Sequence, residues 1–168
     1  MEPVINSSAK RSSSLIVRAS RLGFLLGLLA LASPAVQAAG DAVRGKGLFN
    51  AAGCAGCHTD KKGKGAFVAG GRVLKTPFGV FYSPNITPDP IAGIGRWSDR
   101  NFIRALRHGV APDGRHYFPV FPYPSYNRIS DADLLDIKAY LFTLAPSPRV
   151  NRPHDVPPPF GWRFLLPL

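Results

Sequence analysis

The sequence predicts a mainly α-helical fold with a small β-hairpin and long proline-rich loops. Apolar residues recur at helical spacing in residues 98–109 and 130–145, and a capping aspartate precedes a further helical segment near residues 41–51. Between the first and second of these segments, Gly and Pro interrupt a run of β-branched and aromatic residues. The chain contains 17 glycines and 17 prolines among 168 residues, which favours short elements joined by loops.

Each element has its own local signals. Asp41 can cap the first helix, whose buried face is expected to hold Val43, Gly47 and Leu48. The turn of the hairpin is expected at residues 77–79, where a proline and a glycine lie close together.

The second and third helices have well-marked ends. Ser98 is a suitable N-cap for the second helix, and Gly109 ends it. Ser130 and Asp133 form a variant of the capping box before the third helix. The apolar stripe of the third helix consists of Leu134, Ile137, Leu141 and Leu144, and Pro146 stops the helix.

Residues 1–38 have the pattern of a secretory signal peptide. A basic segment precedes the apolar run of residues 22–32, and Pro34 and two small residues follow it, so cleavage is expected after Ala38. An uncleaved anchor is the alternative, but the run is shorter than the roughly 20 apolar residues of a spanning helix. Export would place the protein in the periplasm. Residues 39–145 would form one domain, and residues 146–168 a proline-rich tail extended over its surface.

The composition narrows the classes of partner and activity. The net charge of +11 is compatible with nucleic acid, anionic lipid or an acidic protein surface. No charge run is long enough to favour nucleic acid, which an exported protein rarely meets. No acid–base pair or Ser/His/Asp set stands out among the few acidic residues, so we expect no catalytic residues and no enzyme activity.

The two cysteines of the chain, Cys54 and Cys57, precede His58 in the motif CAGCH. A redox dithiol would need a βαβ setting, and the sequence shows no such pattern. A structural zinc site would need a second pair of Cys or His ligands, and no such pair follows at suitable spacing. Cys-x-x-Cys-His is the attachment signal for c-type haem. Two thiols on one helical turn can reach both vinyl groups of a porphyrin, and the following imidazole then serves as the proximal iron ligand. The motif therefore predicts one covalent haem c.

Longer motifs carry a resemblance to a known family. A helix before the CAGCH motif, a loop-rich middle and a final helix resemble a class I cytochrome c, in which the first and last helices cross. We expect Gly47 and Tyr140 at that crossing. The motifs TPFGVFYSPNITPD, GIGRWS and FPYPSY resemble the cytochrome c subunits of membrane-bound bacterial dehydrogenases of the alcohol and gluconate type. That family often carries three such domains in one chain, whereas this chain has a single CxxCH motif.

The sixth iron ligand departs from the family pattern. Relatives place a methionine where this chain has Phe121 or Ile129, and the single methionine here is Met1. The resemblance places His116 in the loop facing the distal side of the haem, so His116 is a candidate ligand. An open or water-bound site is the alternative, and His108 and His154 are weaker candidates. Without a methionine sulfur as the sixth iron ligand, the haem should have a lower reduction potential than in methionine-ligated relatives.

The resemblance also implies haem contacts and a function. Tyr82, Asn85 and Trp97 lie in the shared motifs and could donate to the haem propionates, although simple core and turn roles are the alternative. The family implies an electron carrier that takes electrons from a partner dehydrogenase and passes them to another cytochrome or to quinone, with membrane association through a partner. The rival functions are a haem-based small-ligand binder or peroxidase-like protein, and an accessory subunit with a vestigial haem.

Overall fold

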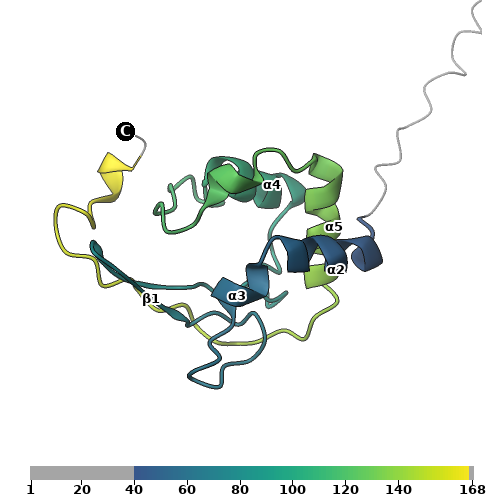
Figure 1. The fold of residues 1–168 in the computed structure, drawn as a ribbon. Coiled ribbons are helices and arrows are strands. Elements are labelled where there is room, and N and C mark those ends of the chain that lie inside the picture. The colour runs from purple at the N-terminus through teal and green to yellow at the C-terminus, as the bar shows by residue number, and fades with distance from the viewer. Residues whose placement is uncertain (1–39, 167–168) are drawn as a thin grey trace, which may run out of the picture. The chain divides into compact units, whose positions relative to one another are not determined.

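The computed structural model of the chain describes residues 40–166, so the predicted signal peptide lies outside the described residues. The described part is mainly helical, with one antiparallel hairpin, which confirms the predicted fold class (Figure 1). No helix within residues 40–166 combines the length and the apolar character needed to cross a membrane. The elements in chain order are α2 (Ala42–Ala51), α3 (Cys54–His58), β1 (Val73–Thr76), β2 (Gly79–Tyr82), α4 (Asp99–His108), the 3-10 helix η2 (Tyr123–Tyr126), α5 (Asp131–Leu141) and the 3-10 helix η3 (Arg163–Leu165).

The first and last α-helices of the domain, α2 and α5, pack across each other (Figure 1). The buried residues of α2 are Gly45 and Phe49, whereas Val43 is 86% exposed. A Cβ on Gly45 would collide with the backbone of Asp136, but a Cβ on Gly47 would meet nothing within 4 Å. The expectation for Gly47 was therefore wrong, because the close approach to α5 occurs two residues earlier.

The N-terminus of α2 is held by two aspartates. Asp41 caps the helix and accepts hydrogen bonds from the backbone N–H groups of Val43 (2.8 Å) and Arg44 (3.1 Å). The buried Asp136 of α5 accepts from the N–H of Asp41 (2.6 Å) and pairs with the guanidinium of Arg44. Burial opposes the charge on Asp136, but these partners outweigh it and hold its pKa below the ordinary value.

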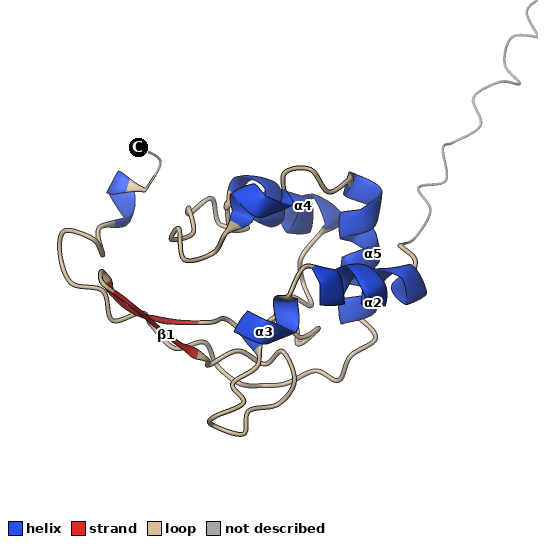
Figure 2. Cartoon of the chain, viewed as in Figure 1, coloured by secondary structure: helices blue, strands red, loops and turns tan. Residues whose placement is uncertain are grey.

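The core lies between α2, α4 and α5 (Figure 2). Leu134, Ile137 and Leu141 of α5 are each at most 2% exposed, and Leu144 packs against the same cluster, which confirms the predicted stripe. The other buried members of the cluster are Phe49, Val68, Ile94 and Phe102. Burial of large apolar side chains of this kind contributes about 1.5–3 kcal/mol each before the entropy cost of folding.

Both predicted ends of α4 and the predicted start of α5 are confirmed, whereas α5 ends at Leu141, before the stop that was expected at Pro146. The hydroxyl of Ser98 accepts from the N–H of Asn101 (3.2 Å), and Gly109 ends α4 with a φ of 62°. The hydroxyl of Ser130 accepts from the N–H of Asp133 (3.1 Å) at the start of α5. These caps satisfy backbone donors that the first helical turn leaves without partners.

The hairpin and the tail together form one side of the fold. β1 and β2 pair in the register Val73↔Tyr82 to Thr76↔Gly79, so the turn falls where the sequence predicts it. The tail runs antiparallel beside β2, and Val80 and Asp155 exchange two backbone hydrogen bonds of 2.7 and 2.9 Å. The tail is thus hydrogen-bonded to the sheet edge as well as extended over the surface.

Candidate functional site

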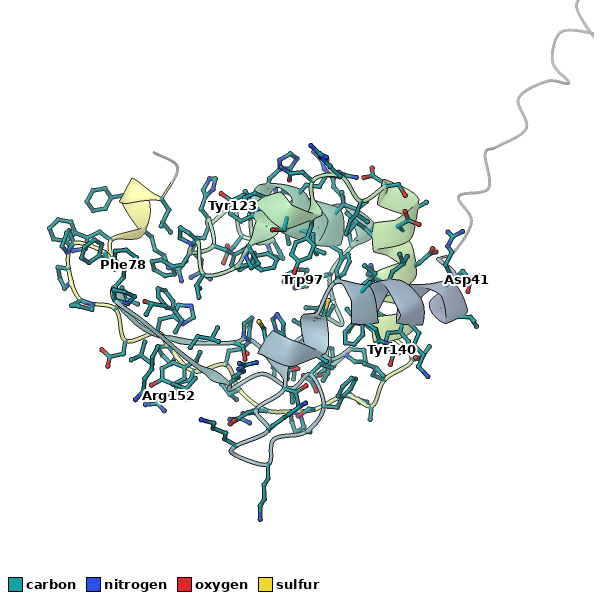
Figure 3. The ribbon with its side chains drawn as sticks, viewed as in Figure 1. Asp41, Phe78, Trp97, Tyr123, Tyr140 and Arg152 are labelled. Carbon is teal, nitrogen blue, oxygen red and sulfur yellow. The ribbon has the colours of Figure 1, made fainter. Side chains whose placement is uncertain are left out.

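A partly open cavity of about 830 Å³ is lined by residues of α3, the hairpin, α4, the loop of residues 115–126 and the tail. This volume lies within the roughly 300–1,000 Å³ that is usual for cofactor and ligand sites. Cys54, Cys57 and His58, which were predicted to hold a haem, all line this cavity. Figure 3 shows Trp97, another of its lining residues, between α4 and α3.

The two thiols lie on the short helix α3, directly after α2. Gly53 joins the two helices with a left-handed φ of 70°, a conformation that glycine adopts at little cost. Cys54 is half-buried and Cys57 is exposed, and no disulfide joins them. Burial raises the pKa of Cys54 to about 11, so its sulfur is a neutral thiol near pH 7. Two thiols one helical turn apart are suited to bond to two neighbouring groups of one flat cofactor.

The imidazole of His58 is oriented by a single hydrogen bond. Its Nδ1 lies 2.8 Å from the carbonyl oxygen of Pro84. A carbonyl can only accept, so Nδ1 carries the proton and Nε2 keeps the lone pair that binds a metal. Burial lowers the pKa of His58, which favours the neutral ring required for ligation. The structure therefore presents His58 as a metal ligand through Nε2.

The wall formed by the loop of residues 115–126 is aromatic and hydroxyl-bearing. Its lining residues include Tyr117, Phe118, Val120, Phe121 and Tyr126, together with Arg115 and Pro122. Burial raises the pKa of Tyr117 to about 12, so this phenol stays protonated near neutral pH. Phe121, which stands where the resemblance led us to expect a methionine, packs against Tyr117 at 5.6 Å between ring centroids.

The side chain of His116 is not among those lining the cavity. Its backbone pairs with Val110, and its carbonyl oxygen accepts from Nη1 of Arg163 at 3.0 Å. These contacts tie the loop to the segment that follows α4 and to the tail. Iron ligation by His116 stays a prediction, and it would require the side chain to turn into the cavity.

A different histidine, His154 of the tail, does line the cavity. Its Nδ1 lies 3.2 Å from the backbone N–H of Tyr82 and accepts from it. The neutral ring then carries its proton on Nε2, which makes Nε2 a donor and removes it as an iron ligand. The ring is packed edge-on against Phe81 and Phe118, at 5.2 and 5.5 Å between centroids. Burial lowers the pKa of His154 and favours this neutral form.

The structure separates the three residues predicted to contact the haem propionates. Tyr82 and Trp97 line the cavity, whereas Asn85 does not. Asn85 is 2% exposed, and its side-chain amide bonds to the tail and to Thr87. Propionate contact by Tyr82 or Trp97 stays a prediction, and the polar atoms of the Asn85 side chain already have protein partners.

Three arginines line the cavity without being recognised from the sequence as site residues, namely Arg115, Arg152 and Arg163. No Asp or Glu is among the lining residues of the described chain. The guanidinium of Arg163 lies 4.6 Å from the ring centroid of Phe118, and that of Arg152 lies 4.1 Å from that of Tyr82. The sequence signal was the basic character of the proline-rich tail, which alone does not reveal that the tail forms a cavity wall.

These features fit a haem c. Two thiols and one imidazole with a free Nε2 lie at one cavity, and its walls are aromatic. The excess of guanidinium over carboxylate at the cavity matches a cofactor that carries two propionates. Arg163, stacked on Phe118 and half-buried, is placed to offset that negative charge. The residues present are therefore those that a covalent haem requires.

Comparison with known proteins gives the same assignment. The chain is 48% identical over 130 residues to a diheme cytochrome c-type protein of Cereibacter sphaeroides, an alignment that covers 76% of this chain and 44% of the relative. It is 41% identical over 152 residues to the gluconate 2-dehydrogenase cytochrome c subunit of Pantoea cypripedii, covering 89% of this chain and 34% of the relative. It is 42% identical over 128 residues to the fructose dehydrogenase cytochrome subunit of Gluconobacter japonicus, covering 73% of this chain and 25% of the relative.

The chain thus spans less than half the length of these curated relatives. A further relative is named as the cytochrome c subunit of a quinone-dependent alcohol dehydrogenase, which confirms the resemblance to dehydrogenase cytochrome c subunits. Such subunits are electron carriers and not the catalytic enzymes. Residues 42–145 match the cytochrome c family over most of the described chain. Together with the arrangement of Cys54, Cys57 and His58, this match shows that the chain belongs to the cytochrome c family.

Proposed function

We propose that this chain transfers electrons in the periplasm through one covalently bound haem c, accepting them from a partner dehydrogenase and passing them to a downstream cytochrome or to quinone. The observation that supports this most directly is that Cys54, Cys57 and the free Nε2 of His58 share one cavity. When bound, haem c supplies one-electron cycling between ferric and ferrous iron.

The chain has three tasks toward this cofactor. The thiols of Cys54 and Cys57 would hold the haem through two thioether bonds. Nε2 of His58 would bind the iron, and the carbonyl of Pro84 keeps the ring in the tautomer that ligation requires. The aromatic side chains and the tail that line the cavity would pack against the macrocycle and reduce its contact with water.

The partner is inferred from the relatives. Several relatives are named as subunits of gluconate, fructose and alcohol dehydrogenases, so a dehydrogenase is the expected electron donor. After the proposed cleavage, the net charge of +11 falls to +8, because residues 1–38 carry four basic residues and one acidic residue. A protein of this charge would associate faster with an acidic protein surface, and this acceleration would fall at high salt.

Covalent attachment is the first test. The full chain should be expressed with a c-type maturation system and analysed as the alkaline pyridine haemochrome. We expect the absorption band of a haem with two thioether bonds. Cys54→Ala and Cys57→Ala should each shift that band to the position of a single thioether, and His108→Ala, a change at an exposed histidine, should leave it unchanged. A chain that matures without covalent haem would overturn the proposed function.

Localisation and partner need separate measurements. N-terminal sequencing of the protein from the periplasmic fraction should give a start after Ala38. Stopped-flow mixing with a reduced sugar or alcohol dehydrogenase should then reduce the haem within a single phase whose rate falls with added salt. Haem that stays oxidised with every such enzyme would contradict the dehydrogenase partner while leaving the haem site intact.

A second function is favoured by one specific observation. No methionine side chain is available in residues 40–166, and His154, the one imidazole besides His58 among the lining residues, uses Nδ1 to accept from Tyr82. An iron without a protein sixth ligand would bind small molecules such as CO. A high-spin spectrum that changes on CO addition would support this function, whereas a low-spin spectrum insensitive to CO that becomes high-spin in His116→Ala would support ligation by His116.

A further inference from the structure

One peptide unit lies between the proximal histidine and the tail. The carbonyl oxygen of Pro84 faces Nδ1 of His58 at 2.8 Å, and the N–H of Asn85 donates to Oδ1 of Asn151 at 2.6 Å. These two groups belong to the same planar peptide, in which a trans arrangement directs C=O and N–H to opposite sides. His58 and Asn151 therefore lie on opposite sides of a single rigid unit and are joined through it.

The orientation of the Asn151 amide is fixed at both ends. Its Oδ1 accepts from the N–H of Asn85, and its Nδ2 donates to the carbonyl oxygen of Ala92 at 3.0 Å. Exchange of the two amide atoms would break both contacts, because an N–H cannot accept and a carbonyl cannot donate. Asn151 consequently presents an acceptor, and not a donor, to the Pro84–Asn85 peptide.

The surrounding contacts keep this peptide in place. Nδ2 of the buried Asn85 donates to the carbonyl oxygens of Ser147 (2.8 Å) and Arg149 (3.1 Å) of the tail. Its Oδ1 accepts from the N–H and the hydroxyl of Thr87, at 2.9 and 2.7 Å. The same hydroxyl accepts from the N–H of Ser147 at 3.1 Å. The side chain of Asn85 is fully hydrogen-bonded, so the loop and the tail hold one another in a single arrangement.

We propose that Asn151 is a positioning residue that sets the electron-donor strength of His58 through the Pro84–Asn85 peptide. Hydrogen bonds in a chain polarise one another, so an acceptor on the Asn85 N–H makes the Pro84 oxygen more negative. That oxygen then draws the Nδ1 proton more strongly, and the ring becomes a better donor at Nε2. A stronger donor favours ferric over ferrous iron. The inference rests on the proposed function, because it takes His58 as the iron ligand.

The proposal predicts opposite effects for two substitutions at one position. Asn151→Leu removes the acceptor, so the Fe–His stretching frequency of the ferrous protein should fall. The equilibrium between oxidised and reduced iron should shift about 2- to 10-fold toward the reduced form, which is the range for the net free energy of one hydrogen bond. Asn151→Asp replaces the amide with a charged acceptor, so the frequency should rise and the oxidised form should be favoured. Asn151 is exposed enough for both variants to fold.

The control for added charge is Val150→Asp. Val150 is 82% exposed and neighbours Asn151 in the chain, so the new carboxylate would act on the iron through space without bonding to the peptide. We measure the resonance Raman Fe–His frequency and the midpoint potential of each holoprotein. Val150→Asp should leave the frequency unchanged. Equal midpoint potentials in Asn151→Leu and the unmodified holoprotein, together with equal Fe–His frequencies where the ferrous iron is five-coordinate, would overturn the proposal. Absence of covalently bound haem in the unmodified protein would overturn the proposed function itself.

Discussion

Gly45 of α2 lies directly against the backbone of Asp136 in α5, so closely that a Cβ at Gly45 would overlap the carbonyl of Asp136. Glycine is needed here for space, and not for an unusual backbone angle, because both residues lie in regular helices. This contact sets the distance between the first and last α-helices of the domain and thereby the position of the core beside the cavity.

Substitution of the two neighbouring glycines of α2 should change stability in opposite directions. Gly45→Ala must push α2 away from α5, and we expect a loss of about 1–3 kcal/mol in the free energy of unfolding. Gly47→Ala has open space at its Cβ and should add about 0.5–1 kcal/mol by raising helix propensity. Urea denaturation of the two holoproteins measures both. A Gly45→Ala variant as stable as Gly47→Ala would contradict the close helix contact.

Asp136 should give the protein part of its acid sensitivity. Its pKa is held below the ordinary value in the fold, so its contribution to stability is present above the unfolded pKa near ~4. This contribution is lost as pH falls through the lower folded value. Asp136→Asn should therefore be less stable than the wild type at pH 7. Its melting temperature should also fall less than that of the wild type between pH 6 and pH 3. Asp155→Asn, at an exposed carboxylate, serves as the control. Parallel curves for the wild type and Asp136→Asn would argue against this role.

His154 should make the stability of the fold depend on pH in a second range, which lies at higher pH than the range for Asp136. Burial lowers its folded pKa, so the neutral ring stabilises the fold above the unfolded value of about 6.5, and this contribution is lost as pH falls toward the folded pKa. His154→Asn keeps an acceptor for the N–H of Tyr82 but does not titrate. Its melting temperature should vary less between pH 7 and pH 5, and its haem spin state should equal that of the wild type. A spin change would mean that His154 ligates the iron after all.

The cap of α5 should carry a measurable share of the stability. Ser130→Ala removes the acceptor for the N–H of Asp133, and loss of such a cap costs about 1 kcal/mol. Ser125→Ala, at an exposed serine of η2, is the matched control and should be close to neutral. Thermal unfolding of both holoproteins compares them, and equal melting temperatures would show that the cap contributes nothing.

Local signals allowed much of the fold to be predicted. Ser98, Gly109 and Ser130 mark helix ends because their own backbone and side-chain chemistry determines the boundary. The turn between β1 and β2 follows in the same way from the residues within it. The motif of Cys54, Cys57 and His58 specifies its cofactor because all three groups lie within one short helix.

The sequence did not reveal contacts that depend on distant partners. The choice of Gly45 over Gly47 depends on where α5 crosses α2, and both glycines look alike in the sequence. Asn85 has a residue type suited to a haem contact, but its partners in the tail are 62 and 64 positions away. Arg163 belongs to a segment without helix or strand periodicity, so no pattern indicated that it would line the cavity. His154 of the same segment was a weaker candidate for the sixth ligand, and the structure does place it at the cavity.

The wall that the tail contributes also affects how the domain assembles. The tail meets the hairpin and the following loop through contacts such as Tyr82 with His154 and Thr87 with Ser147, which are 72 and 60 positions apart. Contacts of such high sequence separation form slowly, because the entropy cost of closing a long loop comes before the contact can stabilise the fold. During synthesis, the CAGCH segment therefore emerges well before its last wall can fold, and under the proposed function this order leaves both thiols accessible for attachment of the haem.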